Sequence, residues 1–172
     1  MVEEDTASLK WRHSMKHVNK SVLLWYSPRE MYALVTAIED YPQFLPWCDR
    51  AEVLQQHDDG VTARLHLAFA GVRQAFTTRN THVDGREVHM RLVDGPFSQL
   101  EGTWRFTPLQ APGAASAEST AAAATACKVE FSLQYAFSSR PLALVISPVF
   151  DRIANTFVDA FVKRAEQVYG PR

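Results

Sequence analysis

The side chains that could support catalysis are scattered through this sequence of 172 residues. Acidic clusters occur at 3–5 and 58–59, but the first lies near the start of the chain and the second in an expected turn. The motifs G-x-S-x-G, G-x-G-x-x-G, H-E-x-x-H and the phosphate-binding P-loop are absent from the sequence. The sequence places no general base beside Cys48, so we expect Cys48 itself to be buried and to pack as a small hydrophobic side chain. These observations predict a protein that is not an enzyme and that has no metal site.

The six histidines form no pattern that would bind a metal ion. His66, His82 and His89 occupy strand positions that alternate with apolar residues, so we expect all three on the solvent side of a sheet. Cys48 and Cys127 are far apart and form no C-x-x-C pair. The acidic first residues do not resemble a signal peptide, and no apolar run reaches roughly 18 residues. We therefore expect a cytoplasmic protein, with peripheral contact at the inner membrane as an alternative.

The composition is typical of a single globular domain, with 47% hydrophobic and 22% charged residues. The 18 basic residues nearly balance the 19 acidic ones, whereas nucleic-acid-binding proteins usually carry a large positive excess. We therefore expect no DNA partner. Residues 1–14 are polar and aperiodic and indicate a disordered tail, and the alanine-rich residues 111–126 indicate a low-complexity loop, with a short helix as the alternative. The chain from 15 to 170 is predicted to form one domain.

Alternation of apolar and polar residues predicts about seven β-strands. It is clearest over 127–137, and similar or weaker alternation marks 17–26, 49–57, 61–70, 74–83, 86–93 and 99–108. Turn-forming residues at 58–60 and 84–85 separate neighbouring strands. The middle of the chain is therefore predicted to be an antiparallel meander with one apolar face.

Two helical regions bracket these strands. Ser27 and Pro28 are typical of a helix start, and the helix is expected to continue through Ile38. A longer helix is predicted from Pro141 to Gly170, where apolar residues recur every three or four positions. Pro148 lies inside this pattern and is expected to kink or restart the helix near Ser147.

The simplest assembly packs the long helix across the apolar face of the sheet, in an α+β fold. Because a twisted sheet curls away from such a helix, we expect a cavity between them, filled by side chains or by a ligand. The alternative is that the aromatic residues simply form a core. The candidate lining residues are Phe44, Trp47, Phe69, Phe76, Met90, Phe97, Leu100, Trp104, Phe131, Phe150, Ile153 and Phe157. Arg79 and Glu101 interrupt strands near this wall and are candidate contacts to a polar head group, with surface positions as the alternative.

The order of the elements resembles the helix-grip fold of START-like lipid-transfer and polyketide-cyclase-like proteins. Three segments resemble the coenzyme Q-binding START-domain family: Tyr-Pro-Gln-Phe-Leu-Pro-Trp-Cys at 41–48, Gly-Pro-Phe followed by Leu, Gly, Trp and Phe over 95–106, and Ala-Phe-Val-Lys-Arg-Ala at 160–165. The alanine-rich insert at 111–126 departs from the family pattern. The resemblance implies a seven-stranded antiparallel sheet curled around a long C-terminal helix, with two short helices after the first strand.

The resemblance also implies two functions, neither enzymatic. The first is binding of ubiquinone or another polyprenyl lipid as a ligand rather than a catalytic cofactor, in support of respiration or quinone handling, with transient contact to a membrane surface. The second is that of a ribosome-association toxin of a toxin–antitoxin pair, which binds the large ribosomal subunit and blocks subunit joining. That role needs a basic surface, for which the candidates are Arg64, Arg73, Arg79, Arg86, Arg91 and Arg105.

A cyclase or aromatase on the same fold is a third hypothesis. Such an enzyme would need a polar cluster inside the pocket, and the strand alternation indicates none. We therefore favour a binding protein over an enzyme.

Overall fold

The computed structural model describes residues 15–109 and 124–172. The predicted tail over 1–14 and most of the alanine-rich segment at 111–126 lie outside the described residues. Seven strands and three helical segments follow one another in the order β1 (Lys16–Leu24), α2 (Pro28–Thr36), η1 (Ile38–Gln43), β2 (Cys48–His57), β3 (Gly60–Phe69), β4 (Val72–Val83), β5 (Glu87–Asp94), β6 (Phe97–Pro108), β7 (Cys127–Phe137) and α4 (Arg140–Tyr169).

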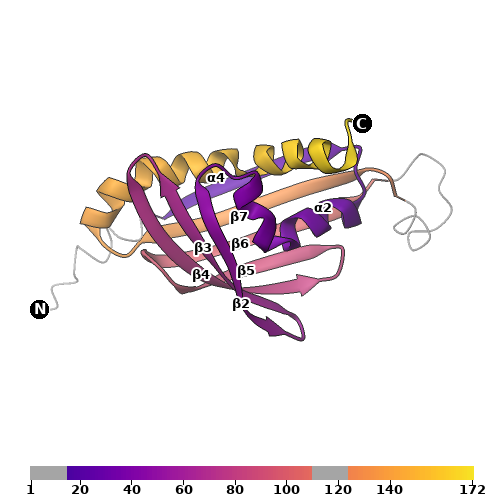
Figure 1. Cartoon of the computed structure of the whole chain (residues 1–172). Helices are drawn as coiled ribbons and strands as arrows, with labels where there is room; N and C mark the ends of the chain where they lie inside the picture. The colour runs from indigo at the N-terminus through magenta and orange to yellow at the C-terminus, as the bar shows by residue number, and fades with distance from the viewer. Residues whose placement is uncertain (1–14, 110–123) are drawn as a thin grey trace, which may run out of the picture.

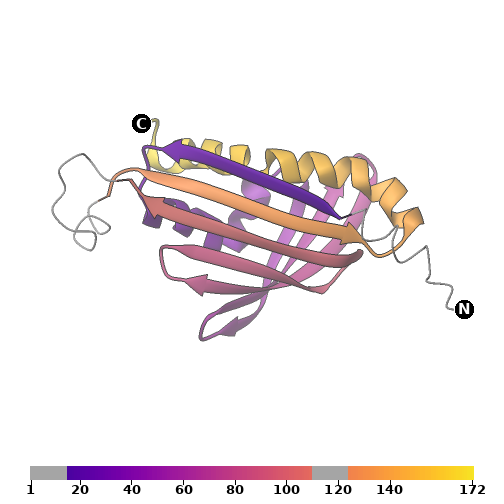
Figure 2. The same ribbon diagram turned by 180° about the vertical axis from the view of Figure 1, so that it is seen from behind.

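The strands form one antiparallel sheet in the order β1-β7-β6-β5-β4-β3-β2. The long helix α4 crosses one face of this sheet, and α2 with the 3₁₀ helix η1 lies beside it on the same side (Figure 1). From behind, β1 crosses in front of part of α4, and β7 and β6 run beside it in roughly the same direction (Figure 2). This is the predicted helix-grip arrangement, and the predicted fold class is confirmed.

Local sequence explains where α2 begins. The Ser27 hydroxyl accepts a hydrogen bond from the Glu30 backbone N–H (3.0 Å), and the Glu30 carboxylate accepts one from the Ser27 N–H (2.9 Å). This reciprocal cap satisfies two backbone donors that the first helical turn leaves free. The helix ends at Thr36, two residues before the predicted Ile38, where η1 begins.

The helix α4 runs from Arg140 to Tyr169 without the restart expected near Ser147. Pro148 removes one backbone donor, but Pro148 and Leu144 are both exposed, so water can satisfy the carbonyl that loses its partner. By length and hydropathy alone α4 could cross a membrane. Its buried residues instead form a stripe against the sheet: Ile146, Phe150, Ile153, Ala154, Val158, Phe161 and Ala165.

Hydrogen bonds hold α4 at both ends of this contact. In its first half, the Asp151 carboxylate forms an ion pair with Lys16 of β1 and accepts a hydrogen bond from the Tyr135 hydroxyl of β7 (2.6 Å). Burial, followed by the neighbouring Asp151 carboxylate, raises the pKa of Tyr135, so this hydroxyl stays protonated and donates. At the other end, the Tyr169 hydroxyl donates to the Glu30 carbonyl of α2 (3.0 Å).

Gly60 permits a close approach of β3 to β4. It has a φ of +155°, and a Cβ built there would lie 1.9 Å from the Asn80 carbonyl oxygen. We expect Gly60→Ala to lower the free energy of unfolding by roughly 2–4 kcal/mol, because backbone atoms of β4 must shift. Gly71 also has a positive φ (+79°) but no atom within 4 Å of a built Cβ, so Gly71→Ala should lose only about 1 kcal/mol. Urea unfolding measures both, and equal losses would contradict the steric explanation.

Candidate ligand-binding site

A groove of about 730 Å³ lies beside α4. One wall is the η1–β2 segment and the end of β3, and the other wall is the face of α4 from Arg152 to Gln167. Its apolar lining comes from prolines, aromatic rings and two aliphatic side chains of α4: Pro42, Phe44, Pro46, Trp47, Phe69, Ile153 and Ala160. The groove therefore offers an apolar surface long enough to follow several turns of the helix.

Two arginines of α4 reach across this groove. The guanidinium carbon of Arg152 lies 5.8 Å from the centroid of the Phe69 ring, and that of Arg164 lies 5.2 Å from the Phe44 ring. Arg164 also donates to the Gln43 side-chain oxygen (3.0 Å). Among the described residues, neither arginine forms an ion pair. Lys163 and Asp159 of α4 also line the groove, so its described rim carries three cations and one carboxylate.

An inner cavity of about 60 Å³ lies deeper, between the sheet and α4. Trp47 and Ile153 line both this cavity and the groove, which makes the two spaces neighbours. The rings of Trp47 and Phe157 lie 5.9 Å apart at the boundary. A space of this volume holds about two water molecules and is far smaller than a typical pocket for an organic ligand.

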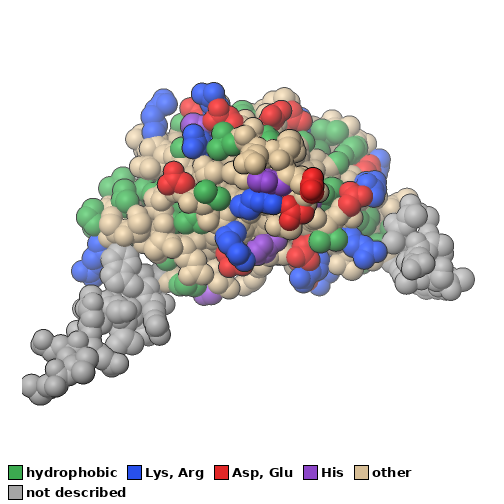
Figure 3. Space-filling view, turned by 90° about the horizontal axis from the view of Figure 1, so that it is seen from below, with side chains coloured by type: hydrophobic (Ala, Val, Ile, Leu, Met, Phe, Trp, Pro, Cys, Tyr) green, Lys and Arg blue, Asp and Glu red, His purple; other side chains and the backbone are tan. Residues whose placement is uncertain are grey.

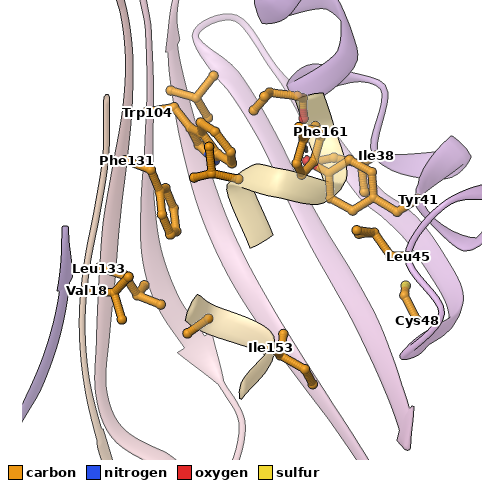
Figure 4. Close-up of a cluster of buried hydrophobic side chains, with 14 of the residues drawn as sticks. Val18, Ile38, Tyr41, Leu45, Cys48, Trp104, Phe131, Leu133, Ile153 and Phe161 are labelled. Carbon is orange, nitrogen blue, oxygen red and sulfur yellow. Dashed lines mark hydrogen bonds between the residues drawn. The ribbon is translucent and has the colours of Figure 1, made fainter. Parts of the chain in front are cut away.

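The interior is therefore much fuller than the expected hollow between sheet and helix. Aromatic rings occupy the space where the two surfaces diverge: the Trp104 ring centroid lies 4.6 Å from that of Phe131, 5.6 Å from that of Phe157 and 5.1 Å from that of Phe161. Figure 4 shows Trp104 and Phe131 on the sheet and Phe161 on α4 in one buried cluster. Most of the available volume lies in the outer groove instead.

The structure separates the twelve predicted lining residues into three groups. Phe44 and Phe69 line only the groove, while Phe97 and Trp104 line neither space. Phe97 packs on Phe150, with ring centroids 4.9 Å apart. The other eight line the inner cavity: Trp47, Phe76, Met90, Leu100, Phe131, Phe150, Ile153 and Phe157.

The two predicted head-group contacts, Arg79 and Glu101, lie on the opposite face of the sheet from the cavity. Arg79 forms an ion pair with Asp59 and donates to the Asn80 carbonyl (2.7 Å). Glu101 contacts the His89 ring nitrogen (2.8 Å). Their neighbours in the strands point into the cavity, and because side chains alternate along a strand, Arg79 and Glu101 point away from it. Both occupy surface positions, as the alternative interpretation expects, and neither lines the cavity or the groove.

Two polar residues that the sequence reading missed do line the inner cavity. Thr78 and Asn80 of β4 are 7% and 5% exposed, and the Thr78 hydroxyl donates to the Asn80 side-chain oxygen (2.7 Å). They lie two and four residues after Phe76, on the same face of the strand, so period-2 alternation from Phe76 could have placed them. The expectation that no polar residues occur inside the pocket is therefore corrected.

The histidines divide between the two faces of the sheet. His66 and His89 lie on the outer face, each within 2.8 Å of a glutamate oxygen, as expected. His82 is different, because its Nε2 is buried without a hydrogen-bond partner among the described residues and its ring lies edge-on to Tyr32. Burial, followed by nearby Arg79, lowers the pKa of His82. The expectation of a solvent-facing His82 is wrong.

The outer face of the sheet mixes both signs of charge. Arg73 pairs with Asp49 (3.7 Å), Arg105 pairs with Glu87 (3.7 Å), and Arg79 is held by Asp59. Viewed from the side away from α4, basic, acidic and histidine side chains are interspersed (Figure 3). The predicted arginine cluster is therefore partly neutralised by carboxylates and does not form a continuous basic surface.

The described residues around the inner cavity provide little acid–base chemistry, and the titratable groups Asp159 and Lys163 lie only on the outer groove. Of the described residues on the inner cavity wall, only Tyr41 titrates, and its hydroxyl donates to the Val35 carbonyl (2.5 Å) while burial raises its pKa. No group of three or more His, Cys, Asp or Glu residues within 15–109 and 124–172 could hold a metal ion. The arrangement is suited to binding an apolar molecule rather than to moving protons.

Comparisons with known proteins agree with this architecture. Residues 24–162 match the family described as polyketide cyclase / dehydrase and lipid transport. A "Ribosome association toxin RatA" of Vibrio cholerae is 38% identical over 91% of this chain and 99% of its own, and a mitochondrial "Coenzyme Q-binding protein COQ10 homolog B" of Xenopus laevis is 29% identical over 88% and 59%. The crystal structure of the Zhui aromatase/cyclase from Streptomyces sp. R1128 superposes with a TM-score of 0.72 at 16% identity, covering 89% of this chain and 94% of that one.

Both cysteines are buried and chemically protected. Burial raises the pKa of Cys48 to about 11 and that of Cys127 to about 12, so at pH 8 roughly a thousandth or less of either thiol is ionised. We expect a disulfide reagent that reports released thiolate by absorbance to leave the native protein unmodified at pH 8 and to modify both thiols in urea. Rapid labelling of the native protein would contradict this assignment.

Proposed function

Because the chain belongs to the polyketide cyclase / dehydrase and lipid transport family, we propose that it binds a polyprenyl lipid, with ubiquinone as the leading candidate. The observation that carries the proposal is the apolar groove of about 730 Å³ that adjoins the inner cavity at Trp47 and Ile153. The printed name of the Xenopus laevis relative, a coenzyme Q-binding protein, supports the same ligand. Such a carrier would serve respiration or quinone handling.

The volumes define how such a ligand would fit. Ligand pockets commonly span about 300–1,000 Å³, so the groove is large enough for an isoprenoid chain and the inner cavity is not. Burial of a prenyl chain against the aromatic wall gains roughly 25 cal/mol per Å². Deeper entry requires the Trp47 and Phe157 rings to separate, which would join the two spaces. A ligand held there would pass to and from a membrane through transient contact of the groove with the bilayer surface.

The proposal does not include a catalysed reaction. The likeness to an aromatase/cyclase is a likeness of fold at 16% identity. Inside the cavity, Thr78 and Asn80 carry a hydroxyl and an amide, which do not act as acid or base near neutral pH. The relatives with the higher identities are named as a toxin and as a binding protein.

The groove can be blocked without disturbing the sheet. Ala160 lines it from α4, so Ala160→Phe is expected to weaken ubiquinone binding at least tenfold by filling the space the ligand needs. Binding is measured by quenching of tryptophan fluorescence in detergent micelles. Val145 is 63% exposed on the same helix, away from the groove, and Val145→Phe is the matched control. Equal affinity of the two variants, or no binding by the unmodified protein, would overturn the proposal.

Association with the large ribosomal subunit is the second candidate function. It is favoured by the 38% identity to a ribosome association toxin over nearly the full length of both chains. The described residues offer local basic sites for such a contact, among them Arg152, Lys163 and Arg164 on the groove rim, whereas the outer face of the sheet mixes both signs of charge.

A sucrose gradient tests this second function. We expect the purified protein to co-sediment with large subunits and to dissociate as the salt concentration rises, because contacts to RNA phosphates release counterions. In cells, its overexpression should lower the fraction of joined 70S ribosomes. Protein that stays at the top of the gradient at low salt, with an unchanged 70S fraction, would exclude this role.

A further inference from the structure

A pair of polar side chains faces the inner cavity from the centre of the sheet. Thr78 and Asn80 are each more than nine-tenths buried, and the wall around them is formed by apolar side chains such as Phe76, Met90 and Leu100. A polar group buried in such surroundings is unfavourable unless its hydrogen bonds are made. The position of this pair in the fold therefore needs an explanation beyond packing.

The hydrogen bonds of the pair are incomplete. The Thr78 hydroxyl donates to the Asn80 Oδ1 atom (2.7 Å), which leaves the Asn80 Nδ2 group with two donor hydrogens. Within the described part of the chain, no atom accepts a hydrogen bond from Nδ2. The amide thus presents a donor on the wall of an otherwise apolar cavity.

The backbone holds this donor in a fixed place. The Asn80 carbonyl accepts a hydrogen bond from the Arg79 guanidinium (2.7 Å), and Gly60 lies close against it on the neighbouring strand. Asn80 pairs with Val61 of β3 and Met90 of β5, so both edges of β4 are occupied at this point. A donor on a rigid central strand can discriminate among ligands better than a donor on a loop.

We propose that Asn80, oriented by Thr78, donates a hydrogen bond to an uncharged oxygen atom of the bound ligand, and so selects an oxygenated isoprenoid over a pure hydrocarbon. This inference rests on the proposed lipid-binding function. None of the described residues that line the inner cavity is cationic, which disfavours a carboxylate or phosphate at this depth. A quinone carbonyl meets both requirements. Because a quinone ring is larger than the inner cavity of about 60 Å³, its entry requires the Trp47 and Phe157 rings to separate, and the prenyl tail would then lie along the groove.

The test compares two ligands and three variants. Wild-type protein, Asn80→Leu, Thr78→Val and Thr77→Val are incubated with a short-chain ubiquinone or with squalene, and retained ligand is measured by mass spectrometry after gel filtration. Thr77 is the matched control, because it is equally buried but lies on the outer face, where its hydroxyl accepts from Arg64 (3.1 Å).

We expect Asn80→Leu to weaken quinone binding roughly tenfold or more, because the buried quinone oxygen loses its hydrogen-bond donor. Squalene binding should be unchanged, because squalene has no oxygen that could accept this hydrogen bond. Thr78→Val should cause a smaller loss, and Thr77→Val none. Equal quinone affinity in wild type and Asn80→Leu would overturn this inference and leave the proposed function intact. Retention of neither ligand by the wild type would overturn both.

A spectroscopic measurement decides the matter if Asn80→Leu does not fold. The infrared stretching band of a ¹³C-labelled quinone carbonyl is expected at lower frequency when bound to the wild type than in a hydrocarbon solvent, because a hydrogen bond weakens the C=O bond. A purely structural role for Asn80 would not move this band. A bound quinone with the hydrocarbon-solvent frequency at both carbonyls would overturn the inference.

Discussion

The contact between the aromatic stripe of α4 and the concave face of the sheet is the interaction on which this structure depends. Phe150 packs on Tyr135 with ring centroids 4.8 Å apart, and Phe161 packs on Trp104 at 5.1 Å. Burial of each ring contributes roughly 1.5–3 kcal/mol to the free energy of folding, a gain that isolated strands or an isolated helix would not have. The same rings set how much empty space is left, so stability and ligand capacity are linked in this fold.

That link explains why the spacious region lies beside the helix. Large side chains on the sheet and on α4 leave an inner cavity of only about 60 Å³. The η1–β2 segment and the end of β3, by contrast, leave the flank of α4 uncovered. Close packing is the normal state of a protein interior, and an open flank adds ligand area without removing core contacts. Trp47 belongs to both spaces and therefore couples occupancy of the groove to the packing of the core.

Much of the fold could be predicted from short-range patterns, because period-2 alternation and the Ser27 cap depend on neighbouring residues. The residues of the candidate site are harder to predict from such patterns. Alternation alone does not say which face of a polar strand is buried, so it does not decide whether Arg79 or Asn80 faces the cavity. Nor could spacing show that Trp104 packs behind the cavity wall, since that depends on how rings from distant elements interlock. Family likeness supplied the architecture where these patterns were weak.

The two anchors of α4 have a mechanical consequence. Asp151 is bound to Lys16 and Tyr135 at one end, and Tyr169 is bound to the Glu30 carbonyl at the other, with the groove-lining turns between them. Movement of these turns away from the sheet would therefore break the contacts at Asp151 or at Tyr169. On the facing wall, Phe69 at the end of β3 contacts α4 through the Arg152 guanidinium, so the width of the groove at this end depends on two side chains. Any change in the width of the groove is therefore expected on the side of Phe69 and the η1–β2 segment rather than on the side of α4.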